Sequence, residues 1–264
     1  MKNSRLIVSA AIAVSAMLGI GAASAADLPM KAMPYAAPPP VFSWTGCYIG
    51  LHAGAGVLLD QGFQTVQQSS LDRHGVGGLA GGQLGCNYQT GMLVLGIEGE
   101  GFWSGMKVTQ DEFAGNNPGT LVASGSIRNK WDYDIAGRFG IAFDRALVYG
   151  KAGWVFGGFD WNAAEVSSSF NNCRTFCTVT QGSATLDGLL IGLGLEYAFT
   201  NNWTAKFEYD YLGFNAKNVN FTSSCADPLC TTRNFTQNVS ADKHIFKVGV
   251  NYLFNAAAPL VAKY

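Results

Sequence analysis

Charged side chains recur at alternate positions in several segments of this 264-residue chain, and they have the clearest potential for chemistry. Only 13% of the residues are charged and the formal net charge is -1, so this grouping is not a general property of the chain. Such groups either line a narrow path for ions or form a polar core in which they neutralise one another. The candidate network consists of Glu98, Glu100, Asp132, Asp134, Arg138, Lys151, Glu196, Lys206, Glu208, Asp210 and Lys247.

The three histidines are the candidates for acid–base chemistry. His52 lies on the face of its segment that we expect to point inward with the charged residues. A looser candidate set consists of His74 and His244, with Asp72, Ser240 and Asp242 nearby in sequence. No nucleophile-elbow, Walker or Rossmann motif accompanies them. We therefore predict no enzyme, no catalytic residue, no cofactor and no metal ion, with a lipid-modifying enzyme as the alternative.

Six cysteines form the third chemically informative set: Cys47, Cys86, Cys173, Cys177, Cys225 and Cys230. An even number in an exported protein favours disulfides. The first two lie on the same apolar face of neighbouring segments and could bridge them, whereas the other four lie in two long polar connections. Those four could close small loops or tie the connections together. A zinc site made of four thiols is the alternative, but an oxidising exterior favours disulfides.

The elements that position these residues are predicted by period-2 alternation. From Leu93 to Trp103 the odd positions are apolar or Gly, whereas the even positions include Glu98 and Glu100. Strands give this period because successive side chains point to opposite faces. We expect eight strands, at 46–59, 75–89, 92–107, 126–143, 146–160, 184–200, 203–218 and 241–254.

Short and long connections alternate between these segments. Tight turns are expected near 89–91, 144–145 and 201–202, and long polar links near 60–74, 108–125, 161–183 and 219–240. In membrane barrels, short turns face the periplasm and long loops face outside. Charge is concentrated on one face of each strand, whereas a soluble lipocalin-like barrel, the alternative, turns polar faces outward. We predict an all-β fold, an eight-stranded antiparallel up-and-down transmembrane β-barrel.

The interior of an eight-stranded barrel is just wide enough for its own side chains. We therefore expect the charged residues to form a salt-bridged plug, with a narrow ion-conducting small porin as the alternative. The long links carry aromatic residues among polar ones, which could anchor a partner or fold back onto the loop base. These are Phe63, Phe113, Phe170, Phe176, Phe221 and Phe235.

The termini indicate export. Lys2 and Arg5 precede an apolar run and the small residues Ala23-Ser24-Ala25, which is typical of a signal peptide. We divide the chain into a signal peptide (1–25), a Pro/Ala-rich periplasmic linker (26–43), the outer-membrane barrel (44–254) and a C-terminal tail (255–264).

The last strand carries a pattern similar to the signal by which outer-membrane proteins are recognised for insertion. Its elements are Lys247, Gly249, Tyr252 and Phe254. A strand edge of this kind can add to the sheet of an assembly machine by backbone pairing. Such proteins usually end at the aromatic residue, whereas this chain continues to Tyr264.

Several motifs together resemble the alphaproteobacterial outer-membrane immunogenic protein family, the small porin-like surface-antigen barrels. They include the Ala26-Asp27-Leu28-Pro29 start, the segment from Trp44 to Gly50, and the segment from Gly249 to Phe254. Cys47 is a departure, because Phe is expected there in most relatives. The resemblance covers the whole chain and implies an envelope and surface-antigen role, with host-surface or haem contacts proposed for some members. It implies no catalytic residues.

The expected function is therefore that of a structural, surface-exposed barrel of the bacterial outer membrane, contributing to envelope integrity and to binding through its loops. The expected partners are outer-membrane lipid, the assembly machinery, and an extracellular ligand or host surface. A chain of nearly neutral charge offers no basic surface for nucleic acid.

Overall fold

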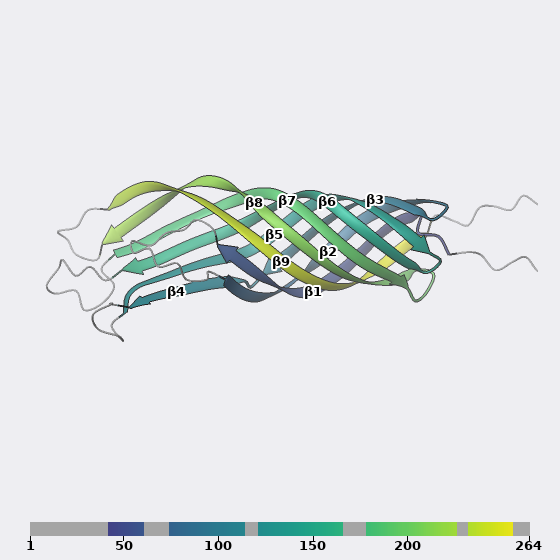
Figure 1. Cartoon of the computed structure of the whole chain (residues 1–264), viewed down its shortest axis with the longest axis horizontal. Helices are drawn as coiled ribbons and strands as arrows, with labels where there is room; N and C mark the ends of the chain where they lie inside the picture. Colours follow the sequence, from purple (N-terminus) through teal and green to yellow (C-terminus); the bar gives the residue numbers. More distant parts are fainter. Residues whose placement is uncertain (1–41, 61–73, 114–120, 166–177, 226–231, 256–264) are drawn as a thin grey trace, which may run out of the picture. The chain divides into compact units, whose positions relative to one another are not determined.

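The computed structural model describes residues 42–60, 74–113, 121–165, 178–225 and 232–255 (Figure 1). Its strands are β1 (Gly46–Asp60), β2 (His74–Thr90), β3 (Leu93–Ser104), β4 (Lys107–Phe113), β5 (Leu121–Phe143), β6 (Ala146–Glu165), β7 (Thr178–Ala198), β8 (Trp203–Cys225) and β9 (Arg233–Asn255). No helix in these ranges is long and apolar enough to cross a membrane. The predicted signal peptide, most of the linker and residues 256–264 lie outside the described residues.

The strands form one antiparallel sheet in the order β3-β2-β1-β9-β8-β7-β6-β5-β4, and pairing of β3 with β5 closes it into a ring. Both β3 and β4 pair with β5, at different levels, so the nine described strands occupy eight positions around the ring. Figure 1 shows β4 at the end of the barrel where β6 ends and β7 begins, which we call the loop end; the opposite end, where β2 turns into β3, is the turn end. The prediction of an antiparallel barrel is confirmed.

The third predicted strand, 92–107, is divided where β3 ends and β4 begins. Gly105 and Met106 lie between them, and β5 has an irregularity between Asn129 and Trp131 at the same level. Backbone hydrogen bonds bridge the break, since Gly105 N donates to Gly78 O and Asn129 N donates to Met106 O. The wall therefore stays closed while the strand changes course.

Five strands extend beyond their predicted bounds at the loop end. β5 begins at 121 instead of 126, β6 ends at 165 instead of 160, β7 begins at 178 instead of 184, β8 ends at 225 instead of 218, and β9 begins at 233 instead of 241. Alternation of apolar and polar residues marks only the part of a strand that faces lipid on one side. Beyond the lipid, the outer face can carry either polar or apolar residues. The alternating pattern from which we predicted the strands therefore stops there.

Polar pairs across β8 and β9 accompany this extension. Side-chain hydrogen bonds of 2.9–3.0 Å join Thr222 to Asn234, Thr236 to Asn220, and Asn238 to Asn218. Phe221 and Phe235, which we expected in a loop, also lie in these strands, with their rings stacked 5.7 Å apart. Phe113 is the last residue of β4, and Phe63, Phe170 and Phe176 lie outside the described residues.

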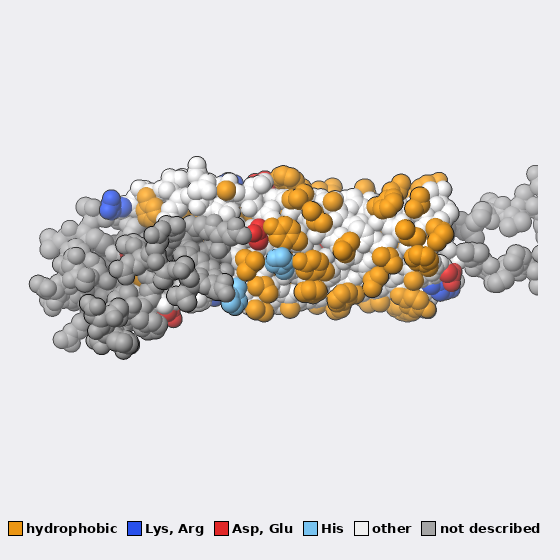
Figure 2. Space-filling view, in the orientation of Figure 1, with side chains coloured by type: hydrophobic (Ala, Val, Ile, Leu, Met, Phe, Trp, Pro, Cys, Tyr) orange, Lys and Arg blue, Asp and Glu red, His pale blue; other side chains and the backbone are white. Residues whose placement is uncertain are grey.

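The outward faces of the strands carry a belt of exposed apolar side chains (Figure 2). Leu51 is 69% exposed and Ile97 65% exposed, although each lies in the middle of its strand. Exposed aromatic residues lie towards both ends of the belt, among them Trp103, Trp154, Tyr197, Phe199 and Trp203. An apolar wall bordered by aromatic residues matches the lipid-facing surface of a membrane barrel.

The turn end of the interior is closed by apolar residues. The segment before β1 folds inward, and Trp44 is 1% exposed. Its backbone N donates a 2.7 Å hydrogen bond to Gln89 Oε1, and its indole Nε1 donates one of 3.1 Å to the carbonyl of Asp144. The Trp44 ring packs edge-on against Phe42, and both cluster with Leu147 and Leu253. We call this group the turn-end plug.

The loop end of the interior is filled by a second apolar cluster, which we call the loop-end core. Its aromatic members pack edge to face or stacked at 5.1–6.1 Å between ring centroids. It includes Phe102, Met106, Val155, Phe159, Trp161, Leu186, Leu190, Leu212, Phe214, Val219, Phe221 and Ile245. The charged residues lie between this core and the turn-end plug, so the interior has three layers.

Inward-facing glycines make room for the large side chains. A Cβ at Gly194 would collide with the ring of Tyr149, and one at Gly192 would collide with the carboxylate of Asp210. Because every side chain of the narrow interior competes for the same space, glycine on one strand allows a large residue on the next.

Candidate functional site in the barrel interior

All eleven predicted network residues lie in the interior, each at most 5% exposed. They come from six neighbouring strands, β3 and β5 to β9, and occupy the inward positions of each. Burying a charge is costly unless it is paired and hydrogen-bonded. The contacts of the network therefore decide what it can do.

Arg138 is the central cation in the half of the network that lies nearest the turn end. Its guanidinium forms an ion pair of 2.7 Å with Glu196 and one of 3.4 Å with Glu98. It also donates to the hydroxyl of Tyr48, which in turn donates a 2.7 Å hydrogen bond to Glu98. The ring of Tyr149 lies 3.9 Å from Arg138 Cζ, in the position of a cation–π contact. The guanidinium is thus enclosed by two carboxylates and two aromatic rings.

Three lysines surround two glutamates in the other half. Lys151 lies 2.8 Å from Glu208 and 3.0 Å from Glu100, and Lys206 lies 2.6 Å from Glu100. Lys247 contacts both glutamates. Because each carboxylate faces several ammonium groups from different strands, the network ties the barrel wall together across its interior.

Asp210 and Asp134 differ in how well their carboxylates are paired. Asp210 lies 2.6 Å from Lys247 and 3.4 Å from Lys151. Asp134 forms no ion pair within the described part of the chain, and both of its carboxylate oxygens are buried without a hydrogen-bond partner there. Asp134 is therefore the least satisfied member of the network.

Lys243 belongs to the interior and was missed by our sequence analysis. It is fully buried, lies 2.5 Å from Asp132, and donates a 3.1 Å hydrogen bond to Asn129 Oδ1. Its ammonium also faces the rings of Phe214 and Phe159, at 5.0 and 5.5 Å from their centroids. Lys243 shares the odd parity of Lys247 on β9, and this signal could have identified it.

A chain of uncharged polar groups extends the network. His52 was predicted to point inward, whereas Gln83 and Asn251 were not named as members of the network. His52 Nδ1 and Gln83 Oε1 share a 2.6 Å hydrogen bond, Gln83 donates to Asn251, and Asn251 donates to Glu196. All lie at inward positions, which is the signal that sequence analysis could have used. The chain connects β1 and β2 to the charges held by the other strands.

A metal site was not predicted, and the contacts of the acidic residues argue against one at this position. Glu98, Glu100 and Glu208 bring oxygen atoms within 4.8 Å of one another. Each of these carboxylates already faces at least one ammonium or guanidinium group. A cation would have to displace these partners, so the geometry supports a self-neutralised core.

Comparisons with known proteins agree with this geometry. Residues 13–254 match the family model described as an outer membrane protein beta-barrel domain. The chain belongs to this family. It is 32% identical to a 31 kDa outer-membrane immunogenic protein of Brucella melitensis, over 88% of this chain and 93% of the relative. It is also 32% identical to a 22 kDa outer membrane protein of Rhizobium leguminosarum, over 70% of this chain and 71% of the relative.

Solved structures show a more distant likeness. The outer membrane protein OprG of Pseudomonas aeruginosa matches 81% of this chain and 99% of its own, at 12% identity and a TM-score of 0.45. As a member of the outer-membrane β-barrel family with immunogenic relatives, the protein lies in the outer membrane. The predictions of the family and of this location are confirmed.

In this outer-membrane barrel, His52 lies apart from the looser set of acid–base candidates, in which His74 and Asp242 both lie opposite Leu59 of β1. His52 is buried in the interior, whereas His74 is exposed at the start of β2. His244 lies on the outward face of β9, where its Nδ1 is 2.7 Å from the hydroxyl of Tyr209. Asp242 accepts a 3.1 Å hydrogen bond from Tyr211, Ser240 also lies on β9, and Asp72 lies outside the described residues.

Cys47, the position at which the chain departs from the family's usual pattern, is disulfide-bonded. Cys47 and Cys86 lie directly opposite each other on β1 and β2 and form a disulfide. The prediction that they bridge neighbouring strands is confirmed. Cys225 ends β8, and the other three cysteines lie outside the described residues.

The residues of the predicted insertion signal lie in β9, which pairs with β8 and β1. Lys247 points inward into the charged layer, whereas Phe254 is 54% exposed on the outer wall. The rings of Tyr252 and Phe254 contact each other edge to face at 5.0 Å. The segment therefore has one charged face and one aromatic face.

Proposed function

We propose that this protein is a structural, surface-exposed barrel that contributes to envelope integrity without conducting ions, and that binds extracellular partners at its loop end. The observation that carries the proposal is the three-layered interior. A permeating ion would have to pass the turn-end plug, the paired charges and the loop-end core in succession. The loop-end core offers such an ion few polar groups to replace its water, which costs several kcal/mol.

The contacts across the interior support a mechanical role. Ion pairs join strands that are not neighbours in the sheet, such as Lys247 of β9 with Glu100 of β3. A barrel held in this way resists deformation of its wall. Envelope integrity would follow from many rigid copies embedded in the membrane.

The extended strands support a binding role at the loop end. β5 to β9 continue past the belt with polar outward faces, and Phe235 remains 38% exposed there. Aromatic residues in polar surroundings are frequent anchors of protein interfaces. An extracellular ligand or a host surface would meet this part of the molecule first.

The proposal is tested by deleting the gene and measuring sensitivity to detergents and large antibiotics. We expect increased sensitivity, restored by the wild-type protein and by a variant in which the β8–β9 connection is shortened. The shortened variant should lose adhesion to host cells or matrix proteins while keeping envelope protection. Unchanged sensitivity of the deletion strain would contradict the structural role.

A narrow ion path is the second candidate, and one observation favours it. Within the described residues, Asp134 is buried without a cationic partner, which would suit transient binding of a cation. The signature would be a cation-selective conductance that Asp134→Asn reduces and that Lys217→Gln, a change at the exposed loop end, leaves unaltered.

A lipid-modifying enzyme is the remaining alternative. The relatives are named as outer-membrane immunogenic proteins and not as enzymes. We propose that His244 has no catalytic role. Mass spectrometry of outer-membrane lipids should show the same species with the wild-type protein and with His244→Ala, and a species lost in the variant would restore the enzyme hypothesis.

We also propose that β9 is the strand recognised by the outer-membrane assembly machinery. Its aromatic outward face and charged inward face support this role. Phe254→Ala should lower the amount of folded barrel in the outer membrane, whereas Phe246→Ala, at another exposed position of β9, should lower it less. Equal amounts in both variants would contradict the proposal.

A further inference from the structure

Three exposed cations lie side by side on the outer wall. Lys107 on β4 is directly opposite Arg128 on β5, and Lys130 follows two residues later. Asp160 on β6 pairs with Lys130 at 2.8 Å. Within the described residues, Lys107 and Arg128 form no ion pair. The cluster therefore carries an excess of positive charge on an outward face.

These cations lie immediately beyond an aromatic group of the belt. Lys130 is followed by Trp131, whose ring stacks on Tyr133 with centroids 5.6 Å apart and planes 9° apart. Trp103, directly opposite Trp131 on β3, is 77% exposed. Exposed Trp and Tyr residues at the edge of an apolar belt mark the level of the lipid headgroups. Lys107, Arg128 and Lys130 are thus at headgroup level or just outside it.

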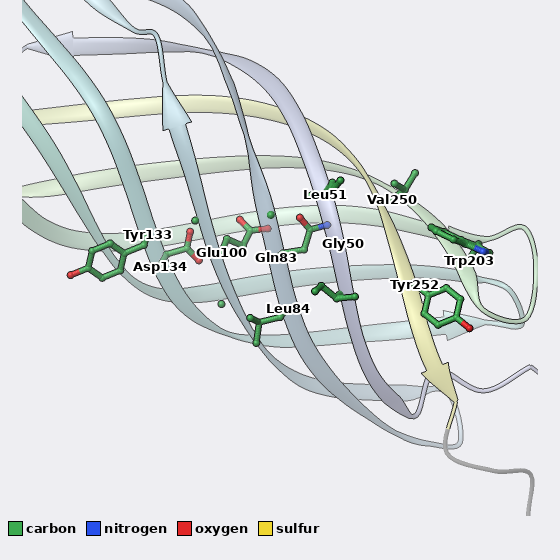
Figure 3. A pocket seen from close by; sticks show the side chains of 14 residues that line it. Gly50, Leu51, Gln83, Leu84, Glu100, Tyr133, Asp134, Trp203, Val250 and Tyr252 are labelled. Atoms are coloured by element: carbon green, nitrogen blue, oxygen red, sulfur yellow. The ribbon is translucent and has the colours of Figure 1, made fainter.

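A groove on the same wall ends at this aromatic group. The groove has a volume of about 860 Å³. It runs from Trp203 to Tyr133 across β8, β9, β1, β2, β3 and β5 (Figure 3). Exposed apolar side chains, such as those of Leu51 and Leu84, line this groove. Tyr133, which stacks on Trp131, joins the groove to the cations.

The groove exists because small residues occupy neighbouring outward positions. Gly82 on β2 lies opposite Gly101 on β3, and Gly99 lies opposite Leu84. A Cβ at Gly99 or Gly101 would meet its nearest atom at 3.6 or 4.0 Å, which is ordinary contact. Larger residues would therefore fit the wall at both positions, and their absence leaves the groove open.

We propose that this wall binds an outer-leaflet lipid with a phosphate-bearing headgroup. The phosphate lies among Lys107, Arg128 and Lys130, and an acyl chain lies in the groove. Two independent features support this occupant: the excess positive charge complements a phosphate, and a long apolar groove over several strands suits a chain better than a compact ligand. Lipid surrounds the groove in the membrane. The inference does not rest on the proposed function, because it concerns the outer wall and not the interior.

The test uses the full-length barrel in phosphatidylcholine vesicles containing either phosphorylated lipid A or its dephosphorylated form. The lipid retained after detergent extraction is counted by native mass spectrometry. The charge variant is Lys107→Gln/Arg128→Gln/Lys130→Gln, and the groove variant is Gly99→Leu/Gly101→Leu. The control variant is Lys217→Gln/Arg233→Gln, which removes two exposed cations of β8 and β9 that lie away from the proposed site. A heat-dependent gel shift verifies that each variant is folded.

We expect the wild-type protein and the control to retain phosphorylated lipid A in preference to the dephosphorylated form. The charge variant should lose affinity for the phosphorylated lipid by about fivefold per cation removed. The groove variant should lose affinity for both forms. Wild-type retention by the charge variant would overturn the phosphate site, and wild-type retention by the groove variant would overturn the chain site. A second copy of the protein bound in place of lipid would overturn both.

Discussion

The charged middle of the barrel and its loop-end core fill the same narrow interior in opposite ways. In the middle, the outer wall is apolar and the interior is charged. At the loop end the interior is apolar, and the outer face changes from apolar, beside Phe102 and Leu190, to polar in the extension. The reversal follows the solvent outside: lipid covers the belt, and water covers the extension. One set of continuous strands thus combines a membrane barrel with a part built like a soluble β-barrel.

Lys243 lies at the boundary between the two regions. It pairs with Asp132 on the charged side and faces the rings of Phe159 and Phe214 on the apolar side. The two layers are therefore in contact at this residue, and Lys247 and His52 also reach the core, since each lies 5.7 Å from the ring of Phe102.

The largest effect is expected from removing a central charge. Arg138→Leu leaves Glu98 and Glu196 without their main cationic partner, which should lower the free energy of unfolding by about 3–5 kcal/mol. Arg138→Lys keeps the charge and should cost less. Denaturant unfolding in lipid vesicles measures both. A loss no greater for Arg138→Leu than for Arg138→Lys would mean that the middle is not held by paired charges.

A change in the loop-end core should have a large but more local effect. Leu212→Ala opens a cavity in a fully buried position and should lower stability by about 2–5 kcal/mol, with faster protease cleavage at the surface of intact cells. The control is Leu195→Ala, at a position 56% exposed to the lipid side. If both variants resist protease equally, the loop end has no core of its own.

The smallest effect is expected from the polar pairs of the extension. Thr236→Val removes the hydrogen bond to Asn220 and should lower stability by about 0.2–1 kcal/mol. Thr109→Val, at an exposed position of β4, is the control. Hydrogen exchange of the β8–β9 amides should rise in the first variant alone, and an equal rise in both would show that these pairs do not support the strands.

The membrane part of this barrel could be predicted from sequence because lipid imposes a strict pattern. The period-2 alternation around Glu98 and Glu100 locates both the strand and its inward face. The loop-end core escaped prediction because residue type does not distinguish an apolar residue on the inward face, such as Phe159 within the predicted strand 146–160, from one that faces lipid. Trp161 lies beyond the predicted end of that strand. Trp44 escaped for another reason: the segment before β1 has no period, and its burial depends on contacts with Gln89 and Asp144 from distant turns.

The central claim is that the interior is closed at three levels, and conductance across planar bilayers tests it most directly. The purified, refolded barrel should give no stable current steps under conditions in which a general porin conducts. Phe159→Ala should remain silent as well, because the charged layer and the turn-end plug still block the path. Stable, cation-selective steps from the wild-type protein, reduced by Asp134→Asn, would contradict the account and establish a narrow pore.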